Sequence, residues 1–284
     1  MKIKAQLGKG KVALVTGGSS GIGKAVACAL AMRGMHVCLL AQRQELLDSA
    51  LTEVEKYREN KEQLIATISA DVSDWDSVQK AMQIIMKQSG TPDILINAAG
   101  VAHPGYVQDL DLSIFNWMMQ VNYFGTVYAT KALLPGMVSR GSGYIVNISS
   151  VAGFIGTFGY TAYGASKFAV RGFSDALRQE LKLYGIGVSV VFPGDTQTAQ
   201  LEYENKVKPP ETKALAGNTK VMSADDVARI IITGIEHGQY KILPGAETKL
   251  LYLLNNIVGG TLASVMDQIV AKANRKKNPN LKEA

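Results

Sequence analysis

Two residues in one short segment, Tyr163 and Lys167, have the types and the spacing for acid–base chemistry. They are four residues apart in a helical pattern that begins at Ala162, so their side chains share one face of the helix. A free phenol, with a pKa of about 10, is a poor proton carrier at neutral pH. Because a nearby ammonium favours the phenolate, we expect the pKa of Tyr163 to be lowered. Tyr160 has no cation at this spacing and is predicted to line a pocket or to pack.

Two further polar residues could complete this group. Ser150 ends a predicted strand thirteen residues before Tyr163, where its hydroxyl could polarise a carbonyl oxygen beside the phenol. Ser149 is the adjacent alternative, because alternation along a strand points only one of the pair at the site. Asn122 is a polar residue on an apolar helical stretch. It is either a buried amide that satisfies backbone groups or a water holder in a proton relay.

A glycine-rich turn, "TGGSSGIG", joins the first predicted strand to the first predicted helix. Its glycines allow a tight turn and let backbone N–H groups and the helix N-terminus approach a pyrophosphate. The turn therefore predicts dinucleotide binding. The two serines fit either a phosphate contact or plain turn chemistry. The predicted contacts in this turn are Gly17, Ser19, Ser20, Gly21, Ile22 and Gly23.

The end of the second predicted strand bears on which dinucleotide binds. An acid there would hydrogen bond the ribose of NAD and repel a 2′-phosphate. The sequence "LLAQR" has no acid and offers Arg43, whose guanidinium suits a phosphate. This favours NADPH, the alternative being an exposed arginine that opens a helix.

The segments after the third and fourth predicted strands could also approach the cofactor. Asp71 and Val72 lie in "ADVSD", where Asp71 could accept from the adenine amino group or could cap a helix, with Asp74 as the competing cap. Asn97 opens "NAAG", whose small residues favour either close approach to the cofactor or tight packing.

Short apolar runs alternate with amphipathic helical patterns along the chain. Several runs are apolar at consecutive positions, as strands covered on both faces should be. The pattern predicts one domain, an α/β doubly wound parallel sheet with helices on both faces. The predicted strands are 11–16, 36–41, 63–69, 93–97, 143–149, 187–192 and 240–243. The predicted helices are 22–34, 44–59, 74–89, 113–138, 162–184 and 224–237.

Two segments lie outside this alternation. Residues 193–222 read as a long irregular loop after a strand's carboxyl end, and we expect a substrate lid there, within a catalytic domain of residues 1–245. Residues 246–284 form a predicted extension with a helix-like apolar stripe and a basic tail. The extension is either a core or oligomer helix or a helix at a membrane interface.

The net charge of +6 is concentrated at the two ends of the chain. Residues 1–11 and 271–284 each carry +4, which leaves −2 for the residues between them. This distribution disfavours nucleic acid as a partner. The basic tails are either solvated or in contact with anionic lipid. Cys28 and Cys38 lie in apolar surroundings, typical of buried thiols. No secretory signal is evident, and we expect a cytoplasmic protein with no metal.

Together these motifs resemble the short-chain dehydrogenase/reductase family over roughly residues 10–245. The match rests on "TGGSSGIG", "NAAG", Asn122, "SS" at 149–150, "YGASK" and "PG" at 193–194. The resemblance implies a Rossmann-type sheet of about seven strands and a catalytic tetrad of Asn122, Ser150, Tyr163 and Lys167. It also implies that Lys167 holds the nicotinamide ribose and that Pro193, Gly194 and Thr198 line the nicotinamide, with Tyr163 protonating the carbonyl oxygen during hydride transfer from NADPH.

The segment after the sixth strand and the segment around Tyr163 are similar to those of 3-ketodihydrosphingosine reductases within that family. The resemblance implies a long-chain lipid ketone as substrate. We also expect a homo-oligomer, dimer or tetramer. Asp195, Glu202 and Glu204 could receive the substrate's amine or could simply be solvated. The alternatives are another hydrophobic carbonyl or alcohol, such as a steroid, a retinoid or a 3-oxoacyl thioester, and a non-catalytic dinucleotide sensor.

Overall fold

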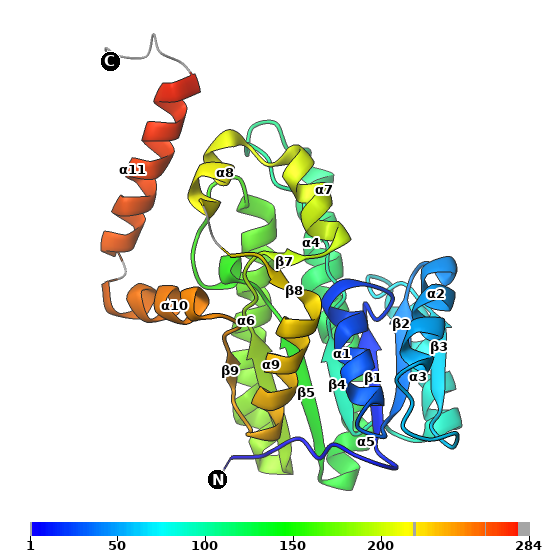
Figure 1. Cartoon of the computed structure of the whole chain (residues 1–284). Helices are drawn as coiled ribbons and strands as arrows, with labels where there is room; N and C mark the ends of the chain where they lie inside the picture. Colours follow the sequence, from blue (N-terminus) through cyan, green and yellow to red (C-terminus); the bar gives the residue numbers. More distant parts are fainter. Residues whose placement is uncertain (1, 218–219, 259, 278–284) are drawn as a thin grey trace.

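Seven parallel strands form the central sheet in a computed structural model that describes residues 2–217, 220–258 and 260–277. The strand order is β3-β2-β1-β4-β5-β6-β9, and every neighbouring pair is parallel (Figure 1). The strands are β1 (Val12–Thr16), β2 (His36–Ala41), β3 (Ile65–Ser69), β4 (Ile94–Asn97), β5 (Gly143–Ile148), β6 (Ile186–Val191) and β9 (Lys241–Ile242). The predicted doubly wound sheet of seven strands is confirmed.

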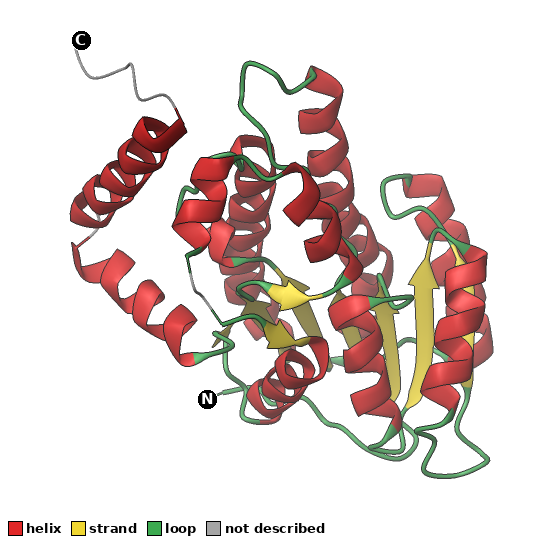
Figure 2. Ribbon diagram, turned by 45° about the horizontal axis from the view of Figure 1, so that its top comes forward, coloured by secondary structure: helices red, strands yellow, loops and turns green. Residues whose placement is uncertain are grey.

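Helices cover both faces of the sheet (Figure 2). On one face α1 (Gly21–Ala31), α2 (Gln44–Glu55) and α9 (Ala224–Glu236) pack into one apolar core. On the other face α3 (Trp75–Ser89), α5 (Gly125–Arg140) and α6 (Thr161–Leu181) form a second. Strands β1 and β6 are buried at every position, as strands between two helical layers must be.

The predicted helix 113–138 is three consecutive helical segments. These are α4 (Leu112–Met118), a wider π-helical segment η1 (Met119–Phe124) and α5. Such a π segment inserts an extra residue into the helical turn and often marks a functional site. Asn122 lies within it and is buried.

The prediction of an irregular loop over 193–222 is wrong. Two helices, α7 (Ala199–Val207) and α8 (Pro210–Ala216), occupy most of it, and two short strands, β7 (Thr196–Gln197) and β8 (Met222–Ser223), pair near its ends. The Thr198 hydroxyl caps α7 by accepting from the Leu201 N–H. The segment is therefore an ordered cap whose two ends are joined by the pairing of β7 with β8. Residues 218–219 are not among the residues that the structure describes.

Two helices, α10 (Ala246–Val258) and α11 (Gly260–Lys277), follow the sheet. The Tyr252 ring packs 5.0 Å from the Phe154 ring, and the Asn255 side chain donates to the Phe154 carbonyl, while α11 packs against α8. The end of the predicted basic tail, residues 278–284, lies outside the described residues, as does the Leu262 side chain of the apolar stripe. In the described part of the chain no helix combines the length and apolar character needed to cross a bilayer.

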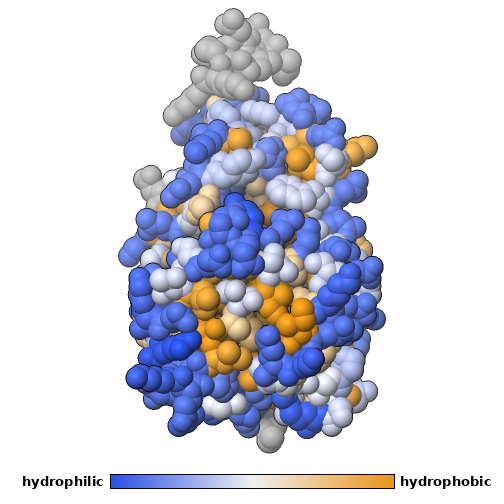
Figure 3. Space-filling view, turned by 90° about the vertical axis from the view of Figure 1, so that its right-hand side faces the viewer, coloured by the Kyte–Doolittle hydropathy of each residue, from blue (hydrophilic) through white to orange (hydrophobic). Residues whose placement is uncertain are grey.

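The face beyond the β3 edge of the sheet is largely hydrophilic, with some apolar side chains gathered near its centre (Figure 3). Helices α10 and α11 lie at the opposite side of the molecule (Figure 1). Exposed apolar side chains on these two helices include Leu250, Leu253, Ile257 and Val265. The exposed apolar surface of the C-terminal helices is therefore separate from the β3 face.

Candidate active site

A cavity of about 1140 Å³ extends from the glycine-rich turn to the two C-terminal helices. It lies at the carboxyl ends of the strands, beside β1, where the strand order reverses: β2 and β3 follow on one side of β1, and the chain then crosses to β4 on the other side. Doubly wound sheets bind their ligands at such a switch point. The sheet topology therefore brings the sequence motifs to one place.

Tyr163, Lys167 and Ser150 all line this cavity. The first two are one turn apart on α6, as their spacing predicts. The Ser150 side chain is hydrogen bonded to the Tyr163 phenol and also accepts from the Ala152 N–H. Ser149 is buried and donates to the Lys167 carbonyl at 2.9 Å. Of the two serines, Ser150 is thus the one beside the phenol.

The expected lowering of the Tyr163 pKa is wrong. Burial raises the pKa of Tyr163, and the negative charge of Glu204 raises it further. The hydrogen bonds from Ser150 and Gln200 oppose this only in part. Burial disfavours a phenolate more than one neighbouring ammonium favours it. The phenol therefore keeps its proton at neutral pH and can act as a proton donor.

Lys167 is held by the end of β5. Its Nζ donates to the Ile148 carbonyl at 3.0 Å, and its side chain is 5% exposed. Burial lowers the pKa of Lys167 to about 8, and the charge of Glu204 opposes that shift. A lysine with this pKa is charged at neutral pH and loses its charge in mildly alkaline solution.

Asn122 lies behind the cavity wall rather than on it. Its Oδ1 accepts from the Val101 N–H at 2.8 Å, and its amide donates to the Val101 carbonyl and to the Ser166 hydroxyl. A Cβ on Gly100 would meet both the Asn122 Oδ1 and the Lys167 Nζ at 3.3 Å. The contacts of Asn122 therefore match the interpretation as a buried amide. Gly100 lies between the Asn122 side chain and Lys167 and is close to both.

The glycine-rich turn forms the floor of one end of the cavity. Gly17 has a φ of +65°, and a Cβ there would lie 2.6 Å from the Ala99 backbone nitrogen. A Cβ on Gly23 would lie 2.3 Å from the Gly17 carbonyl oxygen. Only glycine therefore permits this packing of turn, helix and strand. All six predicted contacts in the turn, from Gly17 to Gly23, line the cavity.

Arg43, Asp71 and Val72 line the same end of the cavity. Asp74 caps α3 by accepting from two backbone N–H groups. Asp71 instead accepts from Ser73 and from the Gln42 side chain. The competition for the helix cap is thus decided in favour of Asp74, and Asp71 stays at the cavity wall.

The Asn97 side chain is packed in the sheet, as the tight-packing alternative has it, and a cofactor contact of this residue stays a prediction. It is 2% exposed and is not among the described residues that line the cavity. Its amide donates to the Asn147 side chain at 2.8 Å and to the Thr130 hydroxyl. Its side chain belongs to a buried network between β4, β5 and α5. The cavity wall after β4 is formed by Ala98, Ala99 and Gly100 instead.

Pro193, Gly194 and Thr198, which follow β6, also line the cavity. A Cβ on Gly21 would lie 3.0 Å from the Thr198 side chain. The start of the cap therefore closes over the glycine-rich turn.

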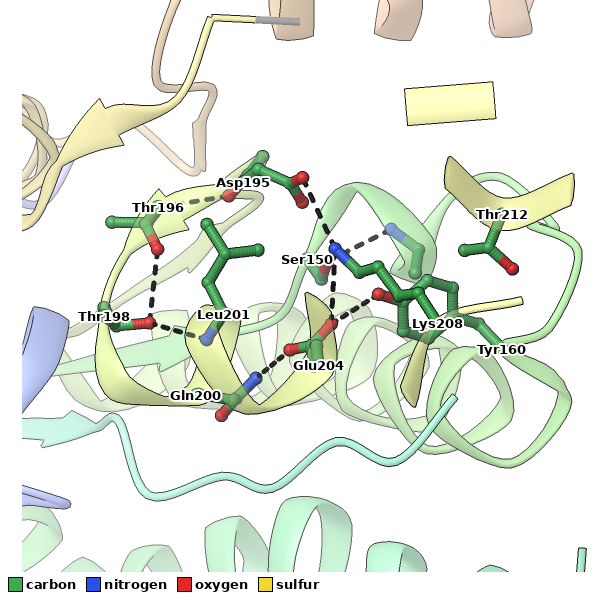
Figure 4. Close-up of polar contacts among 12 residues, drawn as sticks. Ser150, Tyr160, Asp195, Thr196, Thr198, Gln200, Leu201, Glu204, Lys208 and Thr212 are labelled. Carbon is green, nitrogen blue, oxygen red and sulfur yellow. Dashed lines mark hydrogen bonds and ion pairs between the residues drawn. The ribbon is translucent and has the colours of Figure 1, made fainter. Parts of the chain in front are cut away.

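The sequence singled out Glu204 as one possible partner of the substrate's amine but did not show that it belongs to a polar face of α7 that lines the cavity. Gln200, Glu204 and Lys208 lie four residues apart and all line it (Figure 4). Glu204 accepts from the Tyr160 phenol and from the Gln200 amide. Lys208 contacts Asp195 at 3.5 Å and Glu204 at 3.9 Å. The regular spacing was the available signal, but it is hidden when the segment is taken as a loop.

The far end of the cavity is apolar. Leu250, Leu251 and Leu254 of α10 line it, together with Val265, Met266 and Ile269 of α11. One cavity thus joins a polar end at the glycine turn, the Tyr163 group in the middle and an apolar end at the C-terminal helices.

The family profile described as short chain dehydrogenase matches residues 11–208. The chain is 37% identical to the 3-ketodihydrosphingosine reductase of Bos taurus, over 89% of this chain and 76% of that protein. It is 40% identical to the 3-dehydrosphinganine reductase of Danio rerio, over 85% of this chain and 73% of that protein.

Two solved structures are similar in fold. A levodione reductase superposes with a TM-score of 0.78 at 24% identity, over 85% of this chain and 99% of that one. A short chain dehydrogenase/reductase from Burkholderia phymatum in complex with NAD gives 0.77 at 24% identity, over 87% and 93%. The predicted fold agrees with both.

Proposed function

The chain belongs to the short-chain dehydrogenase family, and we propose that it reduces the ketone of 3-ketodihydrosphingosine, a long-chain amino ketone, with NADPH. The observation that carries this proposal is the cavity itself, in which Tyr163 and Ser150 lie between a glycine-rich turn and an apolar end. Relatives at 37–40% identity bear the names 3-ketodihydrosphingosine reductase and 3-dehydrosphinganine reductase, which supports the same substrate.

The residues at the glycine turn fit a nicotinamide dinucleotide. The turn has no side chains at Gly17, Gly21 and Gly23, and α1 begins there, so backbone N–H groups are free to meet a pyrophosphate. Arg43 at the same wall supports NADPH over NADH, because a guanidinium binds a 2′-phosphate and no acid ends β2. A bound NADPH supplies the hydride for ketone reduction.

In this proposal Ser150 and Tyr163 bind the ketone oxygen together, and the Tyr163 phenol donates its proton to that oxygen. Lys167 stabilises negative charge on the phenol by its own charge. Asn122 holds the Val101 backbone and the Ser166 hydroxyl behind Gly100 and so supports the cavity wall beside Lys167. Its role as a water holder in a proton relay stays a prediction.

The apolar end of the cavity fits the alkyl chain of the lipid. Leu251, Leu254 and Met266 supply walls that a small polar ketone does not need. The exposed side chains on α10 and α11, such as Ile257 at 70% exposure, extend this apolar surface to the outside. With Lys272, Arg275, Lys276 and Lys277 nearby in the sequence, we propose that these helices contact an anionic membrane surface, from which the lipid enters.

A screen of NADPH oxidation across ketone classes tests the proposed substrate. We expect turnover of the long-chain amino ketone and little of steroid, retinoid or 3-oxoacyl thioester substrates. Activity on thioesters with none on the amino ketone would overturn the proposal. Sedimentation with anionic vesicles tests the membrane contact, which is wrong if the protein stays in the supernatant at low salt. A cytoplasmic location and a dimer or tetramer stay predictions.

A further inference from the structure

The mechanism above leaves two buried charged side chains of the cavity, Glu204 and Lys208, without a role. Glu204 lies on the cavity face of α7 and is 7% exposed. Its carboxylate accepts from the Tyr160 phenol and from the Gln200 amide at 2.9 Å (Figure 4). The Tyr160 and Tyr163 rings are 5.4 Å apart. Glu204 thus contacts Tyr160, whose ring is next to that of the proposed proton donor, Tyr163.

The charges around Glu204 do not balance. Glu204 and Asp195 share a single ammonium, that of Lys208, at 3.9 Å and 3.5 Å. Two carboxylates and one ammonium leave one negative charge at this wall of the cavity. Among the described residues that line the cavity, the other cations are Lys167, which donates to the Ile148 carbonyl, and Arg43, at the glycine-turn end. The Asp195 side chain is 37% exposed and reaches solvent, whereas Glu204 is buried and lies farther from the shared ammonium. Since a buried charge needs a partner, the wall at Glu204 is suited to a cation that arrives with the substrate.

The negative charge is also unfavourable for the reaction when it stands alone. Glu204 raises the pKa of Tyr163 and so makes the phenol a weaker proton donor. A cation beside Glu204 would offset this effect at the moment when the proton is needed. A plain ketone brings no such cation, whereas an α-amino ketone carries an ammonium on the carbon next to its carbonyl.

On the basis of the proposed function, we propose that Glu204, together with Asp195, binds the protonated α-amine of the substrate. In this proposal a ketone oxygen at Ser150 and Tyr163 places the adjacent ammonium toward Tyr160, Glu204 and Asp195. Lys208 neutralises one carboxylate and the substrate the other. The α7 face is therefore the part of the cavity that selects an amino ketone over an otherwise identical ketone.

Steady-state kinetics with two substrates test this assignment. The substrates are 3-ketodihydrosphingosine and the same long-chain hydroxy ketone without its amine. We expect the full-length wild-type protein to prefer the amino ketone in kcat/KM by roughly 10- to 100-fold, the range of one charged hydrogen-bonded contact. Glu204→Gln, which can accept from the Gln200 amide and donate to the Tyr160 oxygen, should remove most of this preference by slowing reduction of the amino ketone. Below the pH at which Lys167 titrates, the variant should reduce the amine-free ketone at least as fast as wild type does, because the charge that weakens the phenol is gone.

Three further variants separate charge recognition from general damage. Glu202→Gln changes an exposed carboxylate on the same helix and should leave the preference unchanged. Asp195→Asn should reduce it. Lys208→Met removes the competing ammonium and should increase it. Because the readout is a ratio within each variant, a loss of overall stability does not imitate the effect.

Each outcome bears on a different statement. If wild type reduces both ketones equally well, or if Glu204→Gln slows both equally, the assignment of Glu204 is wrong and ketone reduction stands. If neither long-chain ketone supports oxidation of NADPH or NADH, the proposed function is wrong. Titration of the protein with a long-chain amine and the matching alcohol adds a readout without turnover, in which Glu204→Gln should weaken binding of the amine only.

Discussion

The Nζ atom of Lys167 lies 5.7 Å from the centre of the Tyr163 ring and donates a 3.0 Å hydrogen bond to the Ile148 carbonyl. The end of β5 thereby fixes the ammonium next to the phenol. At this distance the cation acts on the ring through its charge. The protonation state of Lys167 therefore affects how readily Tyr163, the proposed proton donor, gives up its proton.

We predict that ketone reduction falls as the pH rises through about 8, where buried Lys167 loses its proton. Tyr163 stays protonated over this range, because its own pKa is raised. The sign follows from a lowered lysine pKa: the cation is present below it and lost above it. The measurement is kcat/KM from pH 6 to pH 10, and a profile that is flat over this range would contradict the prediction.

Glu204→Gln should move that alkaline limb to lower pH. The charge of Glu204 raises the pKa of Lys167, so removing the charge lets desolvation lower it further. The comparison uses the amine-free ketone, so that substrate recognition does not enter. A limb that moves to higher pH in the variant would show that Glu204 does not act on Lys167 in this way.

Arg43→Ala should weaken NADPH binding by roughly 10- to 100-fold, as expected for loss of a charge-assisted contact to phosphate. NADH binding should change by less than about twofold, since NADH carries no 2′-phosphate. Fluorescence titration of both cofactors gives the two affinities, and Arg58→Ala on the surface is the control. An equal loss for NADPH and NADH would show that Arg43 does not bind the 2′-phosphate.

Leu254→Gln should raise KM for a long-chain ketone by roughly three- to tenfold, through loss of apolar contact. The Leu254 side chain lines the cavity, whereas Leu253 beside it is 54% exposed and does not line it. Leu253→Gln is therefore the matched control. Neither change should alter the KM for a short ketone. Equal effects of Leu254→Gln on the KM of short and long ketones would show that α10 does not contact the alkyl chain of the substrate.

Gly23→Ala should lower both the thermal midpoint and the cofactor affinity. The new Cβ would lie 2.3 Å from the Gly17 carbonyl oxygen, so the turn or the helix has to move. Gly172→Ala on α6 has open space around the new Cβ and should stabilise the fold by about 0.5–1 kcal/mol through helix propensity. Thermal unfolding of both variants checks the pair, and a Gly23 variant with an unchanged midpoint and cofactor affinity would contradict the packing argument.

The sheet was predictable because its strands are apolar on consecutive positions between turn signals. The cap at 193–222 was not, because α7 and α8 are short and rich in charged residues, and the break at Lys208 and Pro209 separates them, with Pro210 opening α8. Their stability comes from contacts with the rest of the molecule. The spacing of Gln200, Glu204 and Lys208 has meaning only once α7 is known.

The candidate site was predicted better in position than in electrostatics. The spacing of Tyr163 and Lys167 placed them on one face of α6. The sign of the Tyr163 pKa shift was wrong, because it depends on burial and on Glu204, which a different segment supplies. The sequence left the Asn97 segment between close approach to the cofactor and tight packing, because a side chain at a strand end can point either at a ligand or into the sheet. The buried Asn147 side chain, to which the Asn97 amide donates, holds Asn97 in the sheet.

Transfer of deuterium from labelled NADPH to 3-ketodihydrosphingosine tests the proposed reaction most directly. We predict that mass spectrometry finds the label on the carbinol carbon of dihydrosphingosine. Tyr163→Phe should bind NADPH normally and lower the rate by roughly 10²- to 10⁴-fold, the range for loss of a general acid. Unlabelled product, no product, or an undiminished rate in Tyr163→Phe would contradict Tyr163-assisted reduction of this ketone.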